Sequence, residues 1–245
     1  MNIWKKTNIK KIQNNKINYK PFNNSIWQNK ILSKINRNKK DLKSNYSNFF
    51  LSNSPLPLLI LGSKKKKIKI VDYGSGDQEV LFQLISFKFK NKKILIDSIE
   101  VENITKLLKK KINVSNKNIK IKFYENFDFK KKYDFVHISD SLQYNLDWKI
   151  FLKKIASKQH EYIVLNNLTA GNFKTYISEQ KFYKDKLPYI FFNEKEITKI
   201  FSNYSLYRYL YLNKINGLYQ EYPQENFKKI DRIKYPKTLI FIRKK

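Results

Sequence analysis

Short runs rich in isoleucine, valine and leucine alternate along the chain with segments whose apolar residues recur every three or four positions. The first pattern is typical of buried strands and the second of helices that cover a sheet. The predicted strands are 67–72, 94–99, 119–124, 133–138, 162–168, 206–212 and 238–242. The predicted helices are 56–61, 79–87, 103–111, 148–155 and 193–201. This alternation predicts an α/β protein with a parallel sheet and helices on both of its faces.

The first part of the chain lacks such a pattern. Residues 1 to about 45 are rich in asparagine and lysine and show no sustained period, which predicts a loosely attached extension. The expected organisation is therefore an N-terminal extension with a helical lead-in over 1–62, followed by one domain over 63–245. An insertion rich in tyrosine, proline and glutamine separates the last two strands.

Two of the five glycines follow the first predicted strand, in Val71-Asp72-Tyr73-Gly74-Ser75-Gly76. A tight turn from a buried strand into a helix lets backbone N–H groups approach a ligand that larger side chains would exclude. Asp72 precedes the turn and can orient it or accept a hydrogen bond from the amino group of a ligand. This run predicts a nucleoside-binding loop in which Asp72, Gly74, Ser75 and Gly76 take part.

Ligands of doubly wound sheets bind beyond the carboxyl ends of the strands, so the residues that follow each strand are candidates. Glu100 follows the second strand and can accept both ribose hydroxyls of a nucleoside, and Asp97 takes this role if the strand ends earlier. Tyr124, Glu125 and Asn126 follow the third strand and are placed to meet an adenine ring. Ser139 and Asp140 follow the fourth strand in a polar loop.

The glycine run and Glu100 together resemble the first motif and the ribose acid of class I S-adenosylmethionine-dependent methyltransferases. Gln78 stands where many members of that family have a third glycine. The resemblance implies a Rossmann-like, seven-stranded, mostly parallel sheet with a C-terminal antiparallel hairpin, and S-adenosylmethionine as the cofactor. The cofactor-binding residues it implies are Asp72, Gly74, Ser75, Gly76, Glu100, Tyr124 and Ser139.

A narrower resemblance is to a methyltransferase family of bacterial surface-polysaccharide gene clusters. It is carried by Ser25-Ile26-Trp27, by the loop 139–144, and by the segment 176–188. The resemblance implies methyl transfer to a hydroxyl or amine of a small acceptor, with carbohydrates among the candidates. Tyr144, Tyr176, Gln180 and Tyr183 are the predicted acceptor-binding residues, because rings and an amide suit a sugar or another polar ring.

Methyl transfer to a hydroxyl is helped by a general base, and Asp140 is the predicted base because it follows the fourth strand beside the expected methyl group. The alternative is that Asp140 only caps the next segment. His137 alternates with core residues and is expected to be a buried, hydrogen-bonded side chain. His160 is placed in a loop and is a weaker candidate for catalysis.

The net charge of +31 opens a second hypothesis, an RNA or DNA methyltransferase. Arginine, which contacts phosphate and guanine best, occurs only at positions 37, 208, 232 and 243, and the lysine excess is typical of an AT-rich genome. Nucleic acid is therefore the less favoured partner. A non-catalytic Rossmann-like binding module and a NAD-dependent enzyme remain as further alternatives, although Gln78 disfavours a pyrophosphate site.

The remaining composition restricts the chemistry. The chain has no cysteine and only two histidines, so neither a disulfide framework nor a typical zinc centre is expected. No apolar run approaches the roughly 20 residues of a membrane-spanning helix. The first residues lack the apolar core of a secretion signal, and we expect a cytoplasmic protein.

Overall fold

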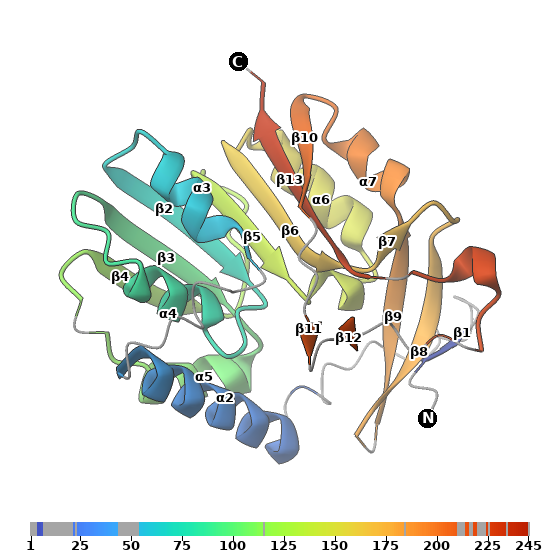
Figure 1. Cartoon of the computed structure of the whole chain (residues 1–245), viewed down its shortest axis with the longest axis horizontal. Coiled ribbons are helices and arrows are strands. Elements are labelled where there is room, and N and C mark those ends of the chain that lie inside the picture. The colour runs from blue at the N-terminus through green and yellow to red at the C-terminus, as the bar shows by residue number, and fades with distance from the viewer. Residues whose placement is uncertain are drawn as a thin grey trace.

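The computed structural model describes residues 4–6, 22, 24–43, 54–114, 116–183, 185–209, 214–215, 218–219, 224, 226–233 and 235–244. The larger sheet consists of β2 (Lys67–Tyr73), β3 (Lys93–Ile99), β4 (Ile119–Tyr124), β5 (Phe135–Ser139), β6 (Tyr162–Leu168), β10 (Tyr204–Tyr209) and β13 (Lys237–Arg243). Its strand order is β10-β13-β6-β5-β2-β3-β4 (Figure 1).

Five neighbouring strands of this sheet, β6 to β4 in that order, run parallel, and β13 runs antiparallel to both β6 and β10. This arrangement confirms the predicted Rossmann-like sheet with an antiparallel C-terminal pair. The strand predicted over 206–212 begins at Tyr204, and residues 210–212 lie outside the described part of the chain.

The register brings the carboxyl ends of the central strands to one level. Tyr73 lies opposite Ile99 of β3 on one side and Ile138 of β5 on the other. The residues that follow these three strands therefore leave the sheet together. Consequently the glycine loop, Glu100 and Asp140 meet at one edge, as the alternation of strands and helices predicts.

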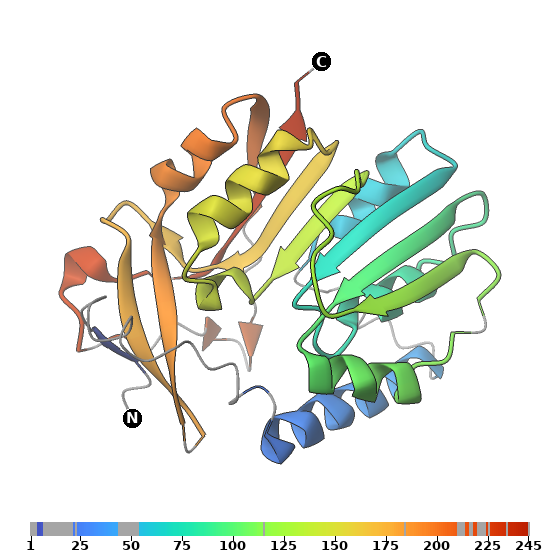
Figure 2. The ribbon, with the colours of Figure 1, turned by 180° about the vertical axis from the view of Figure 1, so that it is seen from behind.

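The helices are α2 (Ser25–Lys43), α3 (Leu56–Gly62), α4 (Glu79–Ser86), α5 (Glu102–Lys111), α6 (Trp148–Ser157) and α7 (Glu194–Ile200). Buried side chains of α2, α3, α4 and α5 pack on one core, and those of α6 and α7 pack on another. Helix α3 lies in front of the sheet in Figure 1, and α6 lies in front of it when the molecule is turned (Figure 2). Helices therefore cover both faces, as predicted.

Helix α2 corrects the prediction for the N-terminal segment, where no periodic element was expected. Its buried positions are Ile31, Ile35 and Asn38, a spacing of four and three that follows one helical face. Only two of these three are apolar, and lysine and asparagine fill most other positions, so the stripe is too narrow to stand out in the sequence. Ile31 and Ile35 are almost completely buried against the same core as Ile68 and Ile70 of β2.

A smaller sheet adds to the prediction, which assigned no strand or helix to 169–192. Its strands are β1 (Trp4–Lys6), β7 (Ala170–Gly171), β8 (Tyr176–Phe182) and β9 (Asp185–Asn193), in the order β1-β8-β9-β7. Pro188 lies inside β9, and proline inside an apolar run argues against a strand when only the sequence is considered. The long β8–β9 hairpin tolerates it opposite Glu179.

Two short strands, β11 (Lys214–Ile215) and β12 (Leu218–Tyr219), pair with each other, and 3-10 helices span Leu142–Tyr144 and Lys229–Asp231. Within the described ranges, no helix has both the length and the apolar character needed to cross a membrane.

Candidate functional site

A cavity of about 900 Å³ lies beyond the carboxyl ends of β2, β3 and β5. Residues of α2 and of the β8–β9 hairpin also line it, and both views show these two elements at that edge of the sheet (Figures 1 and 2). The cavity volume falls in the range of small-molecule and cofactor sites. It is therefore the candidate functional site.

The glycine loop forms one wall of this cavity. Gly74 has a φ of +71°, a left-handed conformation that glycine adopts without strain. Its N–H donates to the carbonyl of Ile99 at 2.9 Å, which fixes the loop to the end of β3. A Cβ atom on Gly74 would lie 2.2 Å from the Cβ of Ser141. Glycine at this position is therefore required by the close packing of two loops of the protein itself.

Gly76 faces the carboxylate of Glu100. The Gly76 N–H donates to Oε1 of Glu100 at 2.7 Å, and the Val101 N–H donates to Oε2 at 3.0 Å. Burial raises the pKa of Glu100 to about 7, although these two N–H groups act in the opposite direction. A Cβ atom on Gly76 would clash with no protein atom, since its nearest neighbours are Ile31 at 3.5 Å and Glu100 at 3.9 Å. Gly76 and the carboxylate both line the cavity, and the left-handed φ of +43° favours glycine at this position.

Asp97, the alternative to Glu100, has other partners. Its carboxylate accepts hydrogen bonds from the Tyr133 hydroxyl at 2.9 Å and from Lys131 at 3.1 Å, and it does not line the cavity. This carboxylate also contributes to a raised pKa of Tyr133, after burial of the phenol, which contributes most. Glu100 is therefore the strand-terminal acid that the fold presents to the cavity.

Gln78 occupies the position of the third family glycine and has the left-handed φ of 61°. Its amide nitrogen donates to Ser75 Oγ at 2.8 Å and to Ser98 Oγ at 3.2 Å, and the two hydroxyls lie 2.7 Å apart. Gln78 is 1% exposed. The departure from the family pattern is thus accommodated by three buried side-chain contacts that hold the glycine loop against β3.

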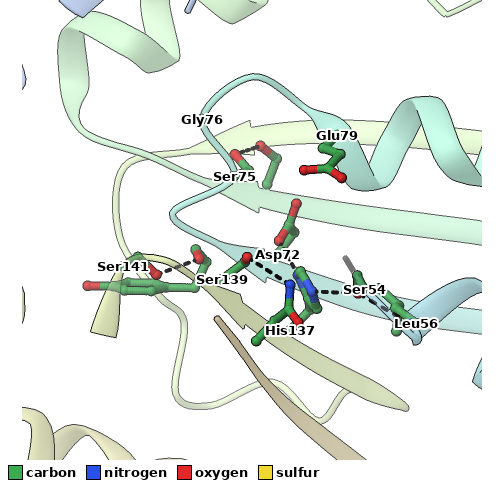
Figure 3. A network of polar contacts seen from close by, with 12 residues as sticks. Ser54, Leu56, Asp72, Ser75, Gly76, Glu79, His137, Ser139 and Ser141 are labelled. Atoms are coloured by element: carbon green, nitrogen blue, oxygen red, sulfur yellow. Dashed lines mark hydrogen bonds and ion pairs between the residues drawn. The ribbon is translucent and has the colours of Figure 1, made fainter. Parts of the chain in front are cut away.

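Asp72 is turned toward β5. Its Oδ1 lies 2.8 Å from Nδ1 of His137, and Nε2 of His137 lies 3.0 Å from Oγ of Ser54 (Figure 3). All three residues are buried, and all three line the cavity. His137 is therefore a hydrogen-bonded side chain of the buried strand, as expected, but it also belongs to a polar chain that reaches the cavity wall.

Asp140 follows β5 and accepts a hydrogen bond from Nδ2 of Asn167 at 3.0 Å. Asp140 is exposed and lines the cavity. Desolvation within the cavity raises the pKa of Asp140 to about 6, and the Asn167 hydrogen bond opposes the shift. Asp140 has a φ of 49°, an uncommon conformation for a residue other than glycine. Neighbouring Ser139 also lines the cavity, and its Oγ accepts from Asn166 at 3.2 Å.

Aromatic side chains form the wall opposite the glycine loop. The hydroxyl of Tyr144 donates to Oε1 of Gln180 at 3.0 Å, so two of the predicted acceptor residues lie together on the cavity. Phe22 packs on Tyr144 and on Phe182 of β8, with ring centroids 5.1 and 5.2 Å apart. Trp27 of α2 also contacts Phe182, at 5.3 Å. These contacts join the start of α2 to the β8–β9 hairpin.

Three predicted site residues do not line the cavity. Tyr124 ends β4 and packs beside the core, with the ammonium of Lys131 4.7 Å from its ring centroid. Tyr176 lies in the core of the smaller sheet, where its hydroxyl donates to the carbonyl of Asp231 at 2.6 Å. Tyr183 is exposed at the tip of the β8–β9 hairpin. The rings of Tyr124 and Tyr176 are turned toward other parts of the fold and Tyr183 is exposed, so the fold does not bring these three residues to the cavity.

The structure adds cavity residues that the sequence did not suggest. Trp27, Ile31 and Lys34 come from α2, and Trp4 and Tyr189 come from the smaller sheet. The spacing of Trp27 and Ile31 by one helical turn was the one available signal for α2. Lys34, Trp4 and Tyr189 can be assigned to the cavity only from the tertiary structure, in which distant segments of the chain lie together.

The charge of the cavity is opposite to that of the whole protein. Six carboxylate side chains line it, namely Asp72, Asp77, Glu79, Glu100, Glu125 and Asp140. Lys34 is the only lysine or arginine among the described lining residues, and it pairs with Asp77 at 3.0 Å. Burial and neighbouring acids also raise the pKa of Glu79. Such a lining favours cationic ligands and disfavours polyanions. Among the described residues, no group of three or more His, Asp or Glu side chains is placed so that it could hold a metal ion.

Comparisons with known proteins give only structural likeness. A protein from Listeria monocytogenes assigned as an S-adenosylmethionine-dependent methyltransferase matches with 10% identity and a TM-score of 0.48, over 78% of this chain and 98% of its own. An S-adenosylmethionine-dependent methyltransferase from Clostridium acetobutylicum matches with 12% identity and a TM-score of 0.47, over 82% and 92% of the two chains. Magnesium protoporphyrin IX methyltransferase from Synechocystis with bound SAM matches with 15% identity and a TM-score of 0.46, over 84% of each chain.

Neither the scan against family models nor the search of curated proteins finds a match. Identities this low assign no activity to this chain. The fold itself rests on the observed strand order, which is that of a Rossmann-like α/β protein with an antiparallel C-terminal pair.

Proposed function

We propose that this protein is a class I S-adenosylmethionine-dependent methyltransferase. The observation that carries the proposal is the meeting of Gly76 and Glu100 at the cavity, where a backbone N–H and a strand-terminal carboxylate lie 2.7 Å apart. Each Glu100 oxygen accepts one backbone N–H and retains a second acceptor site. Two ribose hydroxyls can use these sites.

The residues present fit this cofactor. Gly76 lacks the side chain that would project beside Glu100, so the loop leaves room for a sugar. The carboxylate-rich lining matches a ligand that carries a sulfonium and an ammonium. Gly74, Ser75, Gly76 and Glu100 would hold the nucleoside. Glu125 and Asn126, which were predicted beside Tyr124 and line the cavity, would border the base.

When bound, S-adenosylmethionine supplies an electrophilic methyl group on sulfur. The acceptor must then be held in line with that group, and positioning of this kind contributes much of the rate in displacement reactions. Asp140 is the proposed general base, since it reaches the cavity and its pKa of about 6 leaves it ionised at neutral pH. It would accept the proton that an acceptor hydroxyl or ammonium loses.

The aromatic wall and the carboxylates define the acceptor class. Tyr144 and Gln180, together with the rings of α2, offer flat surfaces and an amide for a planar or polyhydroxylated compound. The negative lining favours an uncharged or cationic acceptor, such as a sugar or an amine, over one that carries phosphate groups. A carbohydrate acceptor and a place in surface-polysaccharide synthesis remain within this proposal, as does the cytoplasmic location.

Nucleic acid fits the cavity less well, despite the net charge of +31. A phosphate backbone is attracted to the basic exterior but repelled by the six carboxylates that surround the proposed methyl-transfer site. The same repulsion disfavours the pyrophosphate of NAD. Weak, salt-sensitive binding of nucleic acid to the surface without methylation is the expected behaviour.

Calorimetric titration with S-adenosylmethionine tests the proposal. The wild-type protein should bind, and Glu100→Gln should bind roughly tenfold or more weakly, because a charge-assisted hydrogen bond contributes about 1.5–3 kcal/mol. Glu102→Gln is the matched control, since this neighbouring acid is exposed and pairs only with Lys106 in the described structure. Folded wild-type protein that takes up no S-adenosylmethionine would refute the proposal.

Methyl incorporation from isotopically labelled cofactor identifies the acceptor. Sets of three compounds can share one scaffold and carry an amine, a hydroxyl or a phosphate. Methyl incorporation should be found in the amine and hydroxyl members and should be low in the phosphate member. Preferential methylation of the phosphate-bearing members, or of RNA or DNA, would contradict the assigned acceptor class while leaving cofactor binding intact.

A further inference from the structure

A second chemical constellation lies on the wall of the same cavity. Ser54, His137 and Asp72 come from three separate segments, and their contacts of 3.0 Å and 2.8 Å fall within hydrogen-bond reach (Figure 3). The sequence separations are 83 residues between Ser54 and His137, and 65 residues between His137 and Asp72. A hydroxyl, an imidazole and a carboxylate in this order have the connectivity of an activated nucleophile, its base and the group that orients the base.

The partners of His137 allow one consistent direction for the two hydrogen bonds. An ionised Asp72 only accepts, so Nδ1 of His137 carries the hydrogen and donates it to Oδ1. Nε2 of His137 is then left as an acceptor. The N–H of Leu56 donates to Oγ of Ser54 at 3.3 Å, and the Ser54 hydroxyl can therefore direct its own hydrogen to Nε2. This is the arrangement in which the imidazole can take the hydroxyl proton.

The other histidine of the chain provides a contrast. His160 accepts the N–H of Tyr133 at Nδ1, at 3.1 Å, and burial lowers its pKa to about 4. No carboxylate contacts it among the described residues, and it does not line the cavity. The two histidines therefore differ: His137 lies between a hydroxyl and a carboxylate on the cavity wall, and His160 does not.

Access supports a chemical role. Ser54, Asp72 and His137 all line the cavity of about 900 Å³, although they are 8%, 3% and 1% exposed. A compound in the cavity therefore reaches these residues without unfolding of the sheet. We propose that Ser54 is an activated nucleophile, with His137 as its base and Asp72 as the residue that positions the base, and that it reacts with esters of small carboxylic acids. This proposal does not rest on the proposed methyl transfer, although both use the same cavity.

The reaction balances as an acyl transfer to water. Ser54 Oγ attacks the ester carbonyl carbon while its proton passes to Nε2 of His137. The bond to the alcohol then breaks, and the alcohol leaves with that proton. Water attacks the resulting acyl ester of Ser54, His137 takes a proton from the water and returns it to Oγ, and the carboxylic acid is released. Asp72 stabilises the imidazolium throughout and is not itself consumed.

The test uses the full-length protein and a fluorophosphonate probe, which forms a stable covalent bond with activated serines. Peptide mass spectrometry should place the adduct on Ser54, and labelled protein should no longer hydrolyse p-nitrophenyl acetate. Absence of an adduct on folded wild-type protein, or hydrolysis that persists after Ser54 is labelled, would overturn the proposal.

A matched control separates activation from mere exposure. Ser63 is buried to the same extent, at 7% exposed, and its Oγ likewise accepts an N–H from two residues ahead, but it does not line the cavity. Ser63→Ala should therefore keep the full labelling rate, whereas Ser54→Ala should lose it. Asp72→Asn should reduce the rate at least tenfold, because an amide can hold the wrong imidazole tautomer. Unchanged labelling in a folded Asp72→Asn variant would remove Asp72 from the triad.

Discussion

The state of the Glu100 carboxyl gives a quantitative prediction for cofactor binding. Its pKa is raised to about 7 by burial, so part of the population carries a proton at neutral pH. Ribose hydroxyls donate to the carboxylate and cannot be matched as well by the protonated acid. A change of pH should therefore change the affinity for S-adenosylmethionine, because binding is coupled to loss of a proton from Glu100.

The magnitude follows from the titration. With a pKa of about 7, about one tenth of the carboxyl groups are ionised at about pH 6 and about half at about pH 7. A ligand that requires the carboxylate should therefore bind about fivefold more tightly at the higher pH. Binding at about pH 7 should release about half a proton per site, and binding at about pH 6 nearly one.

Calorimetry in buffers of different ionisation enthalpy measures both quantities. Glu100→Gln has no proton to lose, so its remaining pH dependence reports the cofactor's own amino group and Asp140. The difference between the two proteins isolates Glu100. If the wild type and Glu100→Gln show the same pH dependence and the same proton release, Glu100 does not hold the ligand, and the assignment of the ribose site is wrong.

Three further predictions concern the fold and the proposed chemistry. Gly74→Ala should lower the free energy of unfolding by about 1–3 kcal/mol through its clash with Ser141. The double variant Gly74→Ala/Ser141→Gly should recover part of this loss. Equal melting temperatures of the single and the double variant would contradict the packing argument. Asp140→Asn should retain cofactor binding. It should lose the rise in methylation rate that wild type shows through about pH 6, because only the ionised carboxylate accepts a proton. An unchanged pH–rate profile would exclude Asp140 as the base. Ile35→Ala on α2 should cost about 2–4 kcal/mol in chemical denaturation, whereas a cost near zero would mean that α2 is not part of the core.

Stability should respond to pH through the same acid. The pKa of Glu100 is higher in the folded protein than its ordinary value of 4.5, so the folded state binds the proton more tightly. Its contribution to stability is fully present below about pH 4.5 and is lost as the pH rises through about 7. Urea denaturation of wild type and Glu100→Gln across this range should show a larger decrease in the wild type, and the difference between the two proteins isolates Glu100, since Asp140 and Glu79 have raised pKa values in both.

The sequence alone determined the central part of the sheet and the position of the candidate site. The strands 67–72, 94–99 and 162–168 agree with the structure to within one residue at each end, since short runs rich in isoleucine, valine and leucine are typical of buried strands. The run around Gly74 and the acid at Glu100 could be placed at one edge because parallel strands all end on the same side. These inferences depend on short stretches of chain, in which the periodicity directly reflects burial.

Only the tertiary structure decided which side chains face the cavity. Helix α2 has a narrow apolar stripe, so its packing on the core becomes apparent only when β2 and α4 are placed beneath it. Tyr124 and Tyr176 occur in segments near the site but turn their rings into other contacts. Ser54 and His137 meet across 83 residues. Contacts at such separations are set by how the layers pack, and no local pattern of polar and apolar residues encodes them.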